Sequence, residues 1–122
     1  MGNDDRSCRE TFGDFEFDLP SARVLRKGAP VPLTQREFTL ALLLFQNMGR
    51  PLSRAHILER VWKQASDTLS RTMDTHISLV RTKLSLRPEN GYRLAPIYGY
   101  GYRLERTDDV EMDSSEVGAG VP

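Results

Sequence analysis

The sequence predicts a small α+β domain, and three observations support this prediction. Short segments with β-type alternation precede residue 34, three segments with helical periodicity occupy residues 34–86, and a glycine-containing pair of β-type segments fills residues 92–104. A chain of 122 residues is long enough for one such domain with its own hydrophobic core. The expected order is therefore an N-terminal antiparallel sheet, three helices and a C-terminal β-hairpin.

The N-terminal sheet is predicted from short strands separated by turns. Residues 15–18 (FEFD) alternate between aromatic and acidic side chains, as a half-buried strand does. Residues 20–22 and 27–30 contain the proline and glycine of two turns, and residues 24–25 begin a second strand between them. A short third strand at residues 31–33 is expected at the sheet edge, because the proline within it cannot donate a ladder hydrogen bond.

The first two helices are predicted from their N-terminal caps. Thr34 and Glu37 have the spacing of a capping box, and the helix that begins there is expected to continue to about Met48. Ser53 is expected to cap a second helix, whose apolar face ends at Trp62.

The third helix is expected over about residues 70–86, after a loop at residues 63–69. Four apolar side chains in it have the spacing of one helix face: Met73, Ile77, Val80 and Leu84. Residues 92–104 then form a hairpin around a glycine-containing turn. This layout is typical of a winged helix-turn-helix, in which the third helix enters the major groove of DNA and the hairpin, or wing, lies along the backbone or minor groove.

The formal net charge is zero, but the charges are sorted along the chain. Residues 50–104 carry ten Lys and Arg against four Asp and Glu, whereas residues 105–122 carry one against six. A basic middle indicates a polyanionic partner. We expect residues 1–10 to be a linker or leader, residues 11–105 to be the folded domain and residues 106–122 to be a disordered acidic tail. This tail is either inert or a DNA mimic that folds over the basic face.

The composition argues against several classes of protein and site. A single cysteine cannot form an internal disulfide, and it fits a reducing cytoplasm. One cysteine and two histidines do not suffice for an ordinary four-ligand zinc site, and no apolar run is long enough to span a membrane. Asp74 and His76 point to different helix faces, so they make no catalytic dyad. We therefore expect no enzyme, no metal, no other cofactor and no signal peptide.

Three motifs resemble those of one family of bacterial regulators. Residues 33–62 (LTQREFTLALLLFQNMGRPLSRAHILERVW) resemble the first two helices of the OmpR/PhoB family, residues 70–77 (SRTMDTHI) resemble the start of its recognition helix, and residues 99–104 (GYGYRL) resemble the end of its wing. The resemblance spans residues 11–105. It implies a winged-helix DNA-binding domain of a two-component response regulator, with four strands in the N-terminal sheet.

The resemblance and the helix geometry together indicate candidate DNA contacts. Arg71 matches a family position that approaches DNA, and Asp74 is expected to pair with it or to cap the helix. Trp62 matches a family tryptophan near the phosphate backbone, although a core aromatic at a helix end is an alternative. His76 is either a boundary core residue or a phosphate donor. The full set is Trp62, Arg71, Thr72, Thr75, His76, Ser78, Leu79, Arg81, Thr82, Lys83, Tyr98, Tyr100 and Arg103.

Three positions depart from the family pattern. Ser78 and Leu79 stand where basic residues are common, and Tyr98 stands where an arginine commonly reaches the minor groove. Fewer cations at the interface mean weaker binding and a smaller salt dependence. Leu79 could contact a thymine methyl group instead, and Tyr98 and Tyr100 could stack or bond to the backbone. An exposed Leu79 could equally mark a protein interface.

The function expected from these features is sequence-specific binding of double-stranded DNA by the output domain of a transcriptional response regulator. A receiver domain normally precedes such a domain and is absent from these residues, so the chain is either an excised or a stand-alone effector. RNA polymerase is an expected partner through residues 63–69, and a homodimer on tandem half-sites is possible in this family. The alternative is a winged-helix module for protein contacts. A basic face formed by Arg71, Arg81 and Lys83 would favour DNA, and an apolar patch around Leu79 would favour protein.

Overall fold

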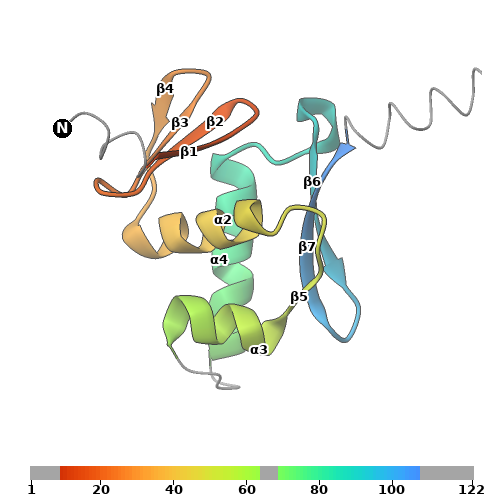
Figure 1. The fold of residues 1–122 in the computed structure, drawn as a ribbon. Coiled ribbons are helices and arrows are strands. Elements are labelled where there is room, and N and C mark those ends of the chain that lie inside the picture. The colour runs from red at the N-terminus through yellow and green to blue at the C-terminus, as the bar shows by residue number, and fades with distance from the viewer. Residues whose placement is uncertain (1–8, 64–68, 108–122) are drawn as a thin grey trace, which may run out of the picture.

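The computed structural model describes residues 9–63 and 69–107. Two antiparallel sheets lie on either side of three helices (Figure 1). The strand order is β1-β2-β3-β4 in the N-terminal sheet and β5-β7-β6 in the C-terminal sheet. The predicted α+β order of sheet, helices and hairpin is therefore confirmed.

The N-terminal sheet has one strand more than the residue pattern alone predicted, in agreement with the family resemblance. Its strands are β1 (Arg9–Phe12), β2 (Phe15–Asp18), β3 (Arg23–Arg26) and β4 (Ala29–Val31). Arg9 and Glu10, which were expected in the leader, belong to β1: Arg9 lies opposite Asp18 in the sheet, and its guanidinium is 3.7 Å from that carboxylate. The expected edge strand at residues 31–33 was misplaced by two residues: Pro30 sits in β4, where only β3 borders it.

The first two helices begin at the predicted caps. Helix α2 (Gln35–Gln46) has both hydrogen bonds of the capping box, from the Glu37 N–H to the Thr34 hydroxyl and from the Thr34 N–H to the Glu37 carboxylate. It ends at Gln46, two residues before the expected Met48. Helix α3 (Arg54–Ile57) is capped by Ser53, and a π-helical segment, η1 (Leu58–Trp62), continues it.

The third helix is shorter than predicted. Helix α4 (Ser70–Lys83) begins at the expected residue but ends three residues before position 86. Ser85 has a φ angle of 52°, in the left-handed region, and a helix cannot continue through this conformation. The predicted core face is confirmed, because Met73, Ile77, Val80 and Leu84 are all at most 1% exposed.

The C-terminal sheet ties the wing to the turn that precedes α3. A short 3₁₀ helix, η3 (Pro88–Asn90), leads into the hairpin of β6 (Tyr92–Ile97) and β7 (Gly101–Arg106), and β5 (Leu52–Ser53) pairs with β7. Residue 101 has to be glycine, because a Cβ atom there would overlap the backbone carbonyl of Leu52. Strand β7 ends at Arg106, one residue beyond the expected domain limit of 105.

An aromatic cluster joins the N-terminal sheet to the helices and to the wing. The ring centroid of Phe45 on α2 lies 5.0 Å from that of Phe15, 5.1 Å from that of Phe17 and 5.8 Å from that of Tyr92. Such tilted contacts add to the stabilisation from burying apolar area. In the described ranges, none of the helices has the length and the apolar character needed to cross a membrane.

A buried carboxylate links α2 to α4. Glu37 is 2% exposed, and the Lys83 ammonium donates a 2.8 Å hydrogen bond to it. Burial by itself raises the pKa of Glu37, but the hydrogen bonds from Lys83 and from the Thr34 N–H outweigh this effect and hold the pKa below its ordinary value of 4.5. Because the folded pKa is depressed, ionised Glu37 stabilises the fold above pH 4.5, and this stabilisation is lost as the pH falls through the folded pKa.

We therefore expect Lys83→Met to lower the free energy of unfolding by about 1–3 kcal/mol at pH 7, since Lys83 is partly exposed and the pair is partly screened. The loss should shrink as the pH falls through the lowered pKa of Glu37, because the carboxylate is then protonated in both proteins. Urea denaturation across this pH range measures it, with Lys27→Met, the same change in an exposed turn, as the control. A loss that does not vary with pH would contradict this account of Glu37.

Candidate nucleic-acid interface

One face of α4 is uncovered by the rest of the described protein. Opposite the buried side chains of this helix lie Arg71, Thr75, Ser78 and Thr82, all exposed. Leu79, beside them, is 40% exposed. We call these five residues the outer face of α4. It carries one cation, one leucine and three hydroxyls.

Arg71 stands at the N-terminal end of this face. Within the described residues its guanidinium has no ion-pair partner, so it is available to a ligand. Its backbone carbonyl accepts a 3.1 Å hydrogen bond from the Thr75 hydroxyl. Thr72, one residue further on, is half-buried and less accessible than the outer face.

The expected pairing of Asp74 with Arg71 is wrong. The Asp74 carboxylate instead lies 3.0 Å from the Arg54 guanidinium of α3 and accepts a 2.7 Å hydrogen bond from the Tyr102 hydroxyl of the wing. Arg54 also donates to the Ser70 carbonyl at 3.2 Å. These partners come from 20 and 28 residues away, so no local pattern indicated them. This Arg54–Asp74–Tyr102 network fixes α3, α4 and the wing relative to one another.

The network shifts the ionisation of its members. Burial raises the pKa of Asp74, but the hydrogen bonds from Arg54 and Tyr102 outweigh it, so that the pKa lies below its ordinary value of 3.8. Burial and the neighbouring Asp74 carboxylate both raise the pKa of Tyr102 above 10.0. The carboxylate is therefore charged and the phenol neutral at physiological pH.

Two of the expected cations do not belong to the outer face. Lys83 points to α2, where it bonds to Glu37. Arg81 points to the wing and donates a 3.1 Å hydrogen bond to the Leu94 carbonyl of β6. The aligned basic face of Arg71, Arg81 and Lys83 therefore does not form, because a 3.6-residue period turns positions 81 and 83 to opposite sides of the helix.

Trp62 and His76 lie against each other at the edge of the helical core. Their rings meet edge to face at 5.2 Å between centroids, and the Arg36 guanidinium lies 5.4 Å from the Trp62 ring centroid. His76 Nδ1 is 2.9 Å from the Thr72 carbonyl, and both rings are half-buried. Each side chain thus packs in the fold while part of it stays accessible.

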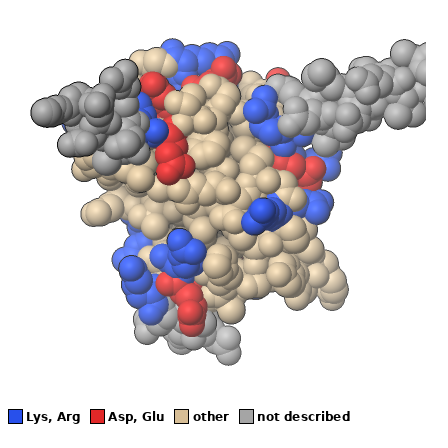
Figure 2. Space-filling view, in the orientation of Figure 1, with Lys and Arg blue, Asp and Glu red and all other residues tan. Residues whose placement is uncertain are grey.

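The turn of the wing is exposed and uncharged. Tyr98 is fully exposed and Tyr100 is 47% exposed, and residues 94–102 contain no Lys, Arg, Asp or Glu. In Figure 2 the corresponding lower right part of the surface is free of blue and red. Arg103, further along β7, is half-buried and donates to Glu105 at 3.0 Å. The turn of the wing therefore offers phenol groups to a partner and no cation, whereas Arg93, further along β6, is exposed.

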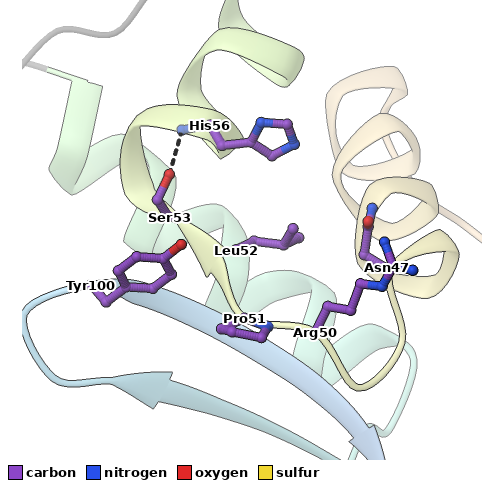
Figure 3. Close-up of a pocket in the computed structure, with 7 residues that line it drawn as sticks. All are labelled: Asn47, Arg50, Pro51, Leu52, Ser53, His56 and Tyr100. Carbon is purple, nitrogen blue, oxygen red and sulfur yellow. Dashed lines mark hydrogen bonds between the residues drawn. The ribbon is translucent and has the colours of Figure 1, made fainter.

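A polar hollow of about 320 Å³ lies beside the wing turn, between the turn after α2 and the start of α3. Figure 3 shows Tyr100 on the wing side with its hydroxyl toward Ser53, and Asn47 and Arg50 on the far side, from the turn after α2. His56, also exposed, completes the rim. The hollow places one cation and several hydrogen-bonding groups beside the wing.

Most of the predicted polymerase loop, residues 64–68, lies outside the described residues, as do residues 1–8 of the leader and 108–122 of the tail.

Residues 28–104 match the family described as "Transcriptional regulatory protein, C terminal". The chain belongs to this family. It is 39% identical to the transcriptional regulatory protein CreB of Escherichia coli over 98 residues, which cover 76% of this chain and 41% of CreB. The chain therefore spans less than half of this relative. The family is one of transcription regulators and not of enzymes, and no group of three metal-binding side chains occurs in the described ranges.

Solved structures agree with this assignment. The DNA-binding domain of CpxR from E. coli superposes with a TM-score of 0.72 at 26% identity, over 81% of this chain and 97% of that domain. The Klebsiella pneumoniae RstA DNA-binding domain, solved in complex with the RstA box, gives a TM-score of 0.69 at 25% identity, over 80% of this chain and 96% of that one. The fold is a winged helix, and the resemblance to the OmpR/PhoB family is confirmed.

Asp74→Asn tests the network of this transcription-regulator domain. The variant removes the charge that raises the pKa of Tyr102, so the Tyr102 phenol should ionise at a lower pH than in the wild type, as NMR of the ring would report. The free energy of unfolding at pH 7 should fall by about 0.5–1 kcal/mol, a small value because Asp74 is nearly half exposed. Glu89→Gln, which neutralises an exposed acid, is the control. An unchanged Tyr102 titration would mean that the Asp74 contact does not persist in solution.

Proposed function

We propose that this chain is the DNA-binding output domain of a transcriptional response regulator and that it binds double-stranded DNA sequence-specifically. In this proposal α4 lies in the major groove and the wing lies on the backbone or in the minor groove. The observation that carries it is the outer face of α4, which the described residues leave uncovered. The chain that carries this face belongs to a family of transcription regulators. The RstA relative solved with its DNA box supports the same assignment.

The proposed contacts follow from the chemical groups that each side chain exposes. Arg71 would bind a phosphate or a guanine, and the hydroxyls of Thr72, Ser78 and Thr82 suit phosphates or base edges. Thr75 would offer its methyl group, because its hydroxyl donates to the Arg71 carbonyl. Tyr98 and Tyr100 would meet the backbone beside the groove. Trp62, His76 and Arg103 are half-buried and would contribute their accessible edges at the border of the interface.

Arg81 and Lys83, placed among the contacts from the sequence, would act mainly by long-range attraction, since both already have protein partners. We add Arg54 and Tyr102 to the proposed contacts. The Arg54–Asp74–Tyr102 network would hold both side chains so that their exposed parts meet the DNA backbone. Because the outer face of α4 carries one cation, Arg71, we infer that affinity depends little on salt and that specificity rests on hydroxyl and apolar contacts.

Further partners belong to the same proposal. RNA polymerase would be met by residues 63–69, and two copies would pair on tandem half-sites. A receiver domain would precede the chain in the complete regulator, and DNA binding would take place in the cytoplasm. The second candidate function is a protein-binding module, which the uncharged wing turn and Leu79 favour. In that case α4 and the wing would dock on a partner protein.

Selection from a random duplex library, followed by gel shifts on the enriched sequence, tests the proposal. Enrichment of one sequence, with displacement by that duplex and not by a scrambled one, would support it. Retention on heparin without any enrichment would favour the protein-binding candidate.

We expect Arg71→Ala to weaken binding of the enriched duplex by about 1–3 kcal/mol, because the free guanidinium makes a close contact. Titrations at fixed salt measure the loss, and Arg23→Ala, an exposed arginine on the N-terminal sheet, is the control. Affinity that is equal in Arg71→Ala and wild type would remove Arg71 from the interface. An unchanged melting temperature separates lost contact from lost folding.

Adding charge to the outer face tests the docking geometry. The double variant Ser78→Arg, Leu79→Arg should raise non-specific DNA affinity and steepen the slope of log affinity against log salt by up to about two. The control is Ser21→Arg, Ala29→Arg, which adds the same charge on the N-terminal sheet, away from the wing turn (Figure 1). Equal slopes in the two variants would show that α4 does not face the duplex.

A further inference from the structure

An exposed leucine stands in the middle of the outer face of α4. Leu79 is 40% exposed, although its chain neighbour Val80 is fully buried in the core. Only two other large hydrophobic side chains in the described ranges are so exposed, Tyr98 and Tyr100, and both lie on the wing turn. The apolar surface of Leu79 is thus not explained by packing.

Among the described residues, the immediate neighbours of Leu79 on the outer face of α4 carry hydroxyl and methyl groups and no charge. Thr75, Ser78 and Thr82 are its exposed neighbours on the helix. Lys83, four residues after Leu79, points to α2, where Glu37 holds it at 2.8 Å, and the cation of the outer face, Arg71, stands eight residues before Leu79. The side chain of His76, three residues earlier, packs on the Trp62 ring. This part of the face therefore cannot neutralise a phosphate.

Thr75 extends the apolar character of this surface. Its hydroxyl donates to the Arg71 carbonyl of the same helix at 3.1 Å, so the methyl group is the part that remains for a ligand. Thr75 and Leu79 are four residues apart, which corresponds to about 6 Å along a helix axis. This distance is close to two base steps, since bases of one strand are about 3.4 Å apart.

The chemistry of the major groove selects among the bases for such a surface. Guanine is recognised by Arg or Lys and adenine by Asn or Gln, whereas thymine alone exposes an apolar group, the C5 methyl. We propose that Leu79, assisted by the Thr75 methyl group, reads thymine methyl groups in the major groove. This inference rests on the proposed function and names the base class that the outer face of α4 prefers.

Docking of a partner protein is the competing explanation, and the structure favours it less. Interaction patches on proteins are contiguous apolar areas of a few hundred Å². Leu79 is instead bordered by hydroxyl-bearing residues on both sides along the helix. One apolar side chain surrounded by hydroxyl groups matches a DNA groove in which one methyl group is surrounded by polar base edges.

Deoxyuridine gives a direct test, because it pairs as thymine does but lacks the methyl group. The duplex enriched from the random library is synthesised with thymine and, position by position, with deoxyuridine. Removal of the contacted methyl group should weaken wild-type binding about fourfold, the value of one buried carbon group. Leu79→Ala should bind the thymine duplex more weakly and lose most of this discrimination.

A double-mutant cycle separates a contact from a general effect on the DNA. Leu79→Met keeps an apolar side chain of similar volume and should retain the discrimination, whereas Arg71→Ala should weaken both duplexes by the same factor. Circular dichroism of each variant checks that it is folded. Coupling between Leu79 and a single thymine position would support the proposal.

Three results would overturn the inference, and they differ in whether the proposed function remains valid. If the enriched duplex binds equally well with thymine and deoxyuridine at every position, DNA binding stands but methyl recognition does not. If Leu79→Ala discriminates as strongly as the wild type, another residue reads the methyl group. If no duplex is enriched at low salt, the proposed function fails, and the inference fails with it.

Discussion

The carboxylate of Asp74 is the point on which the arrangement of the C-terminal half depends. It accepts hydrogen bonds from α3, through Arg54, and from the wing, through Tyr102, while it sits on α4 itself. Each partner alone would be a partly exposed contact of small value. Together with the hydrogen bonds from Arg54 to the Ser70 carbonyl and from Arg81 to the Leu94 carbonyl, they connect α3, α4 and the wing to one another.

Several of the positive charges in residues 50–104 are bound to other groups of the same domain. Lys83 neutralises the buried Glu37, Arg54 binds Asp74 and Arg81 bonds to the backbone of β6. What remains outward on α4 is one arginine, a leucine and three hydroxyls. Formal charge along a sequence therefore overstates the positive potential that a partner meets, because intramolecular partners take up part of it.

Local signals in the sequence predicted the helices, whereas contacts between residues far apart in the chain decided the first strand and the site. The capping box of Thr34 and the spacing from Met73 to Leu84 depend on residues within a few turns, so both were predictable. The partner of Lys83 lies 46 residues away on α2, and its identity depends on how the helices pack. The start of β1 likewise depends on Asp18, across a turn that the residue pattern did not reveal.

The close approach of Gly101 to the backbone of Leu52 limits how the wing can adjust. Since β5 is hydrogen-bonded to β7, the base of the hairpin moves only together with the connection between α2 and α3. The three residues between β6 and β7 form the turn, in which Gly99 has a φ angle of 70° and the Tyr100 carbonyl accepts a 2.9 Å hydrogen bond from the Arg54 N–H. A surface that meets this domain therefore has to fit a wing that is joined by backbone hydrogen bonds to β5 and to α3, and only the exposed Tyr98 and Tyr100 side chains can turn to meet it.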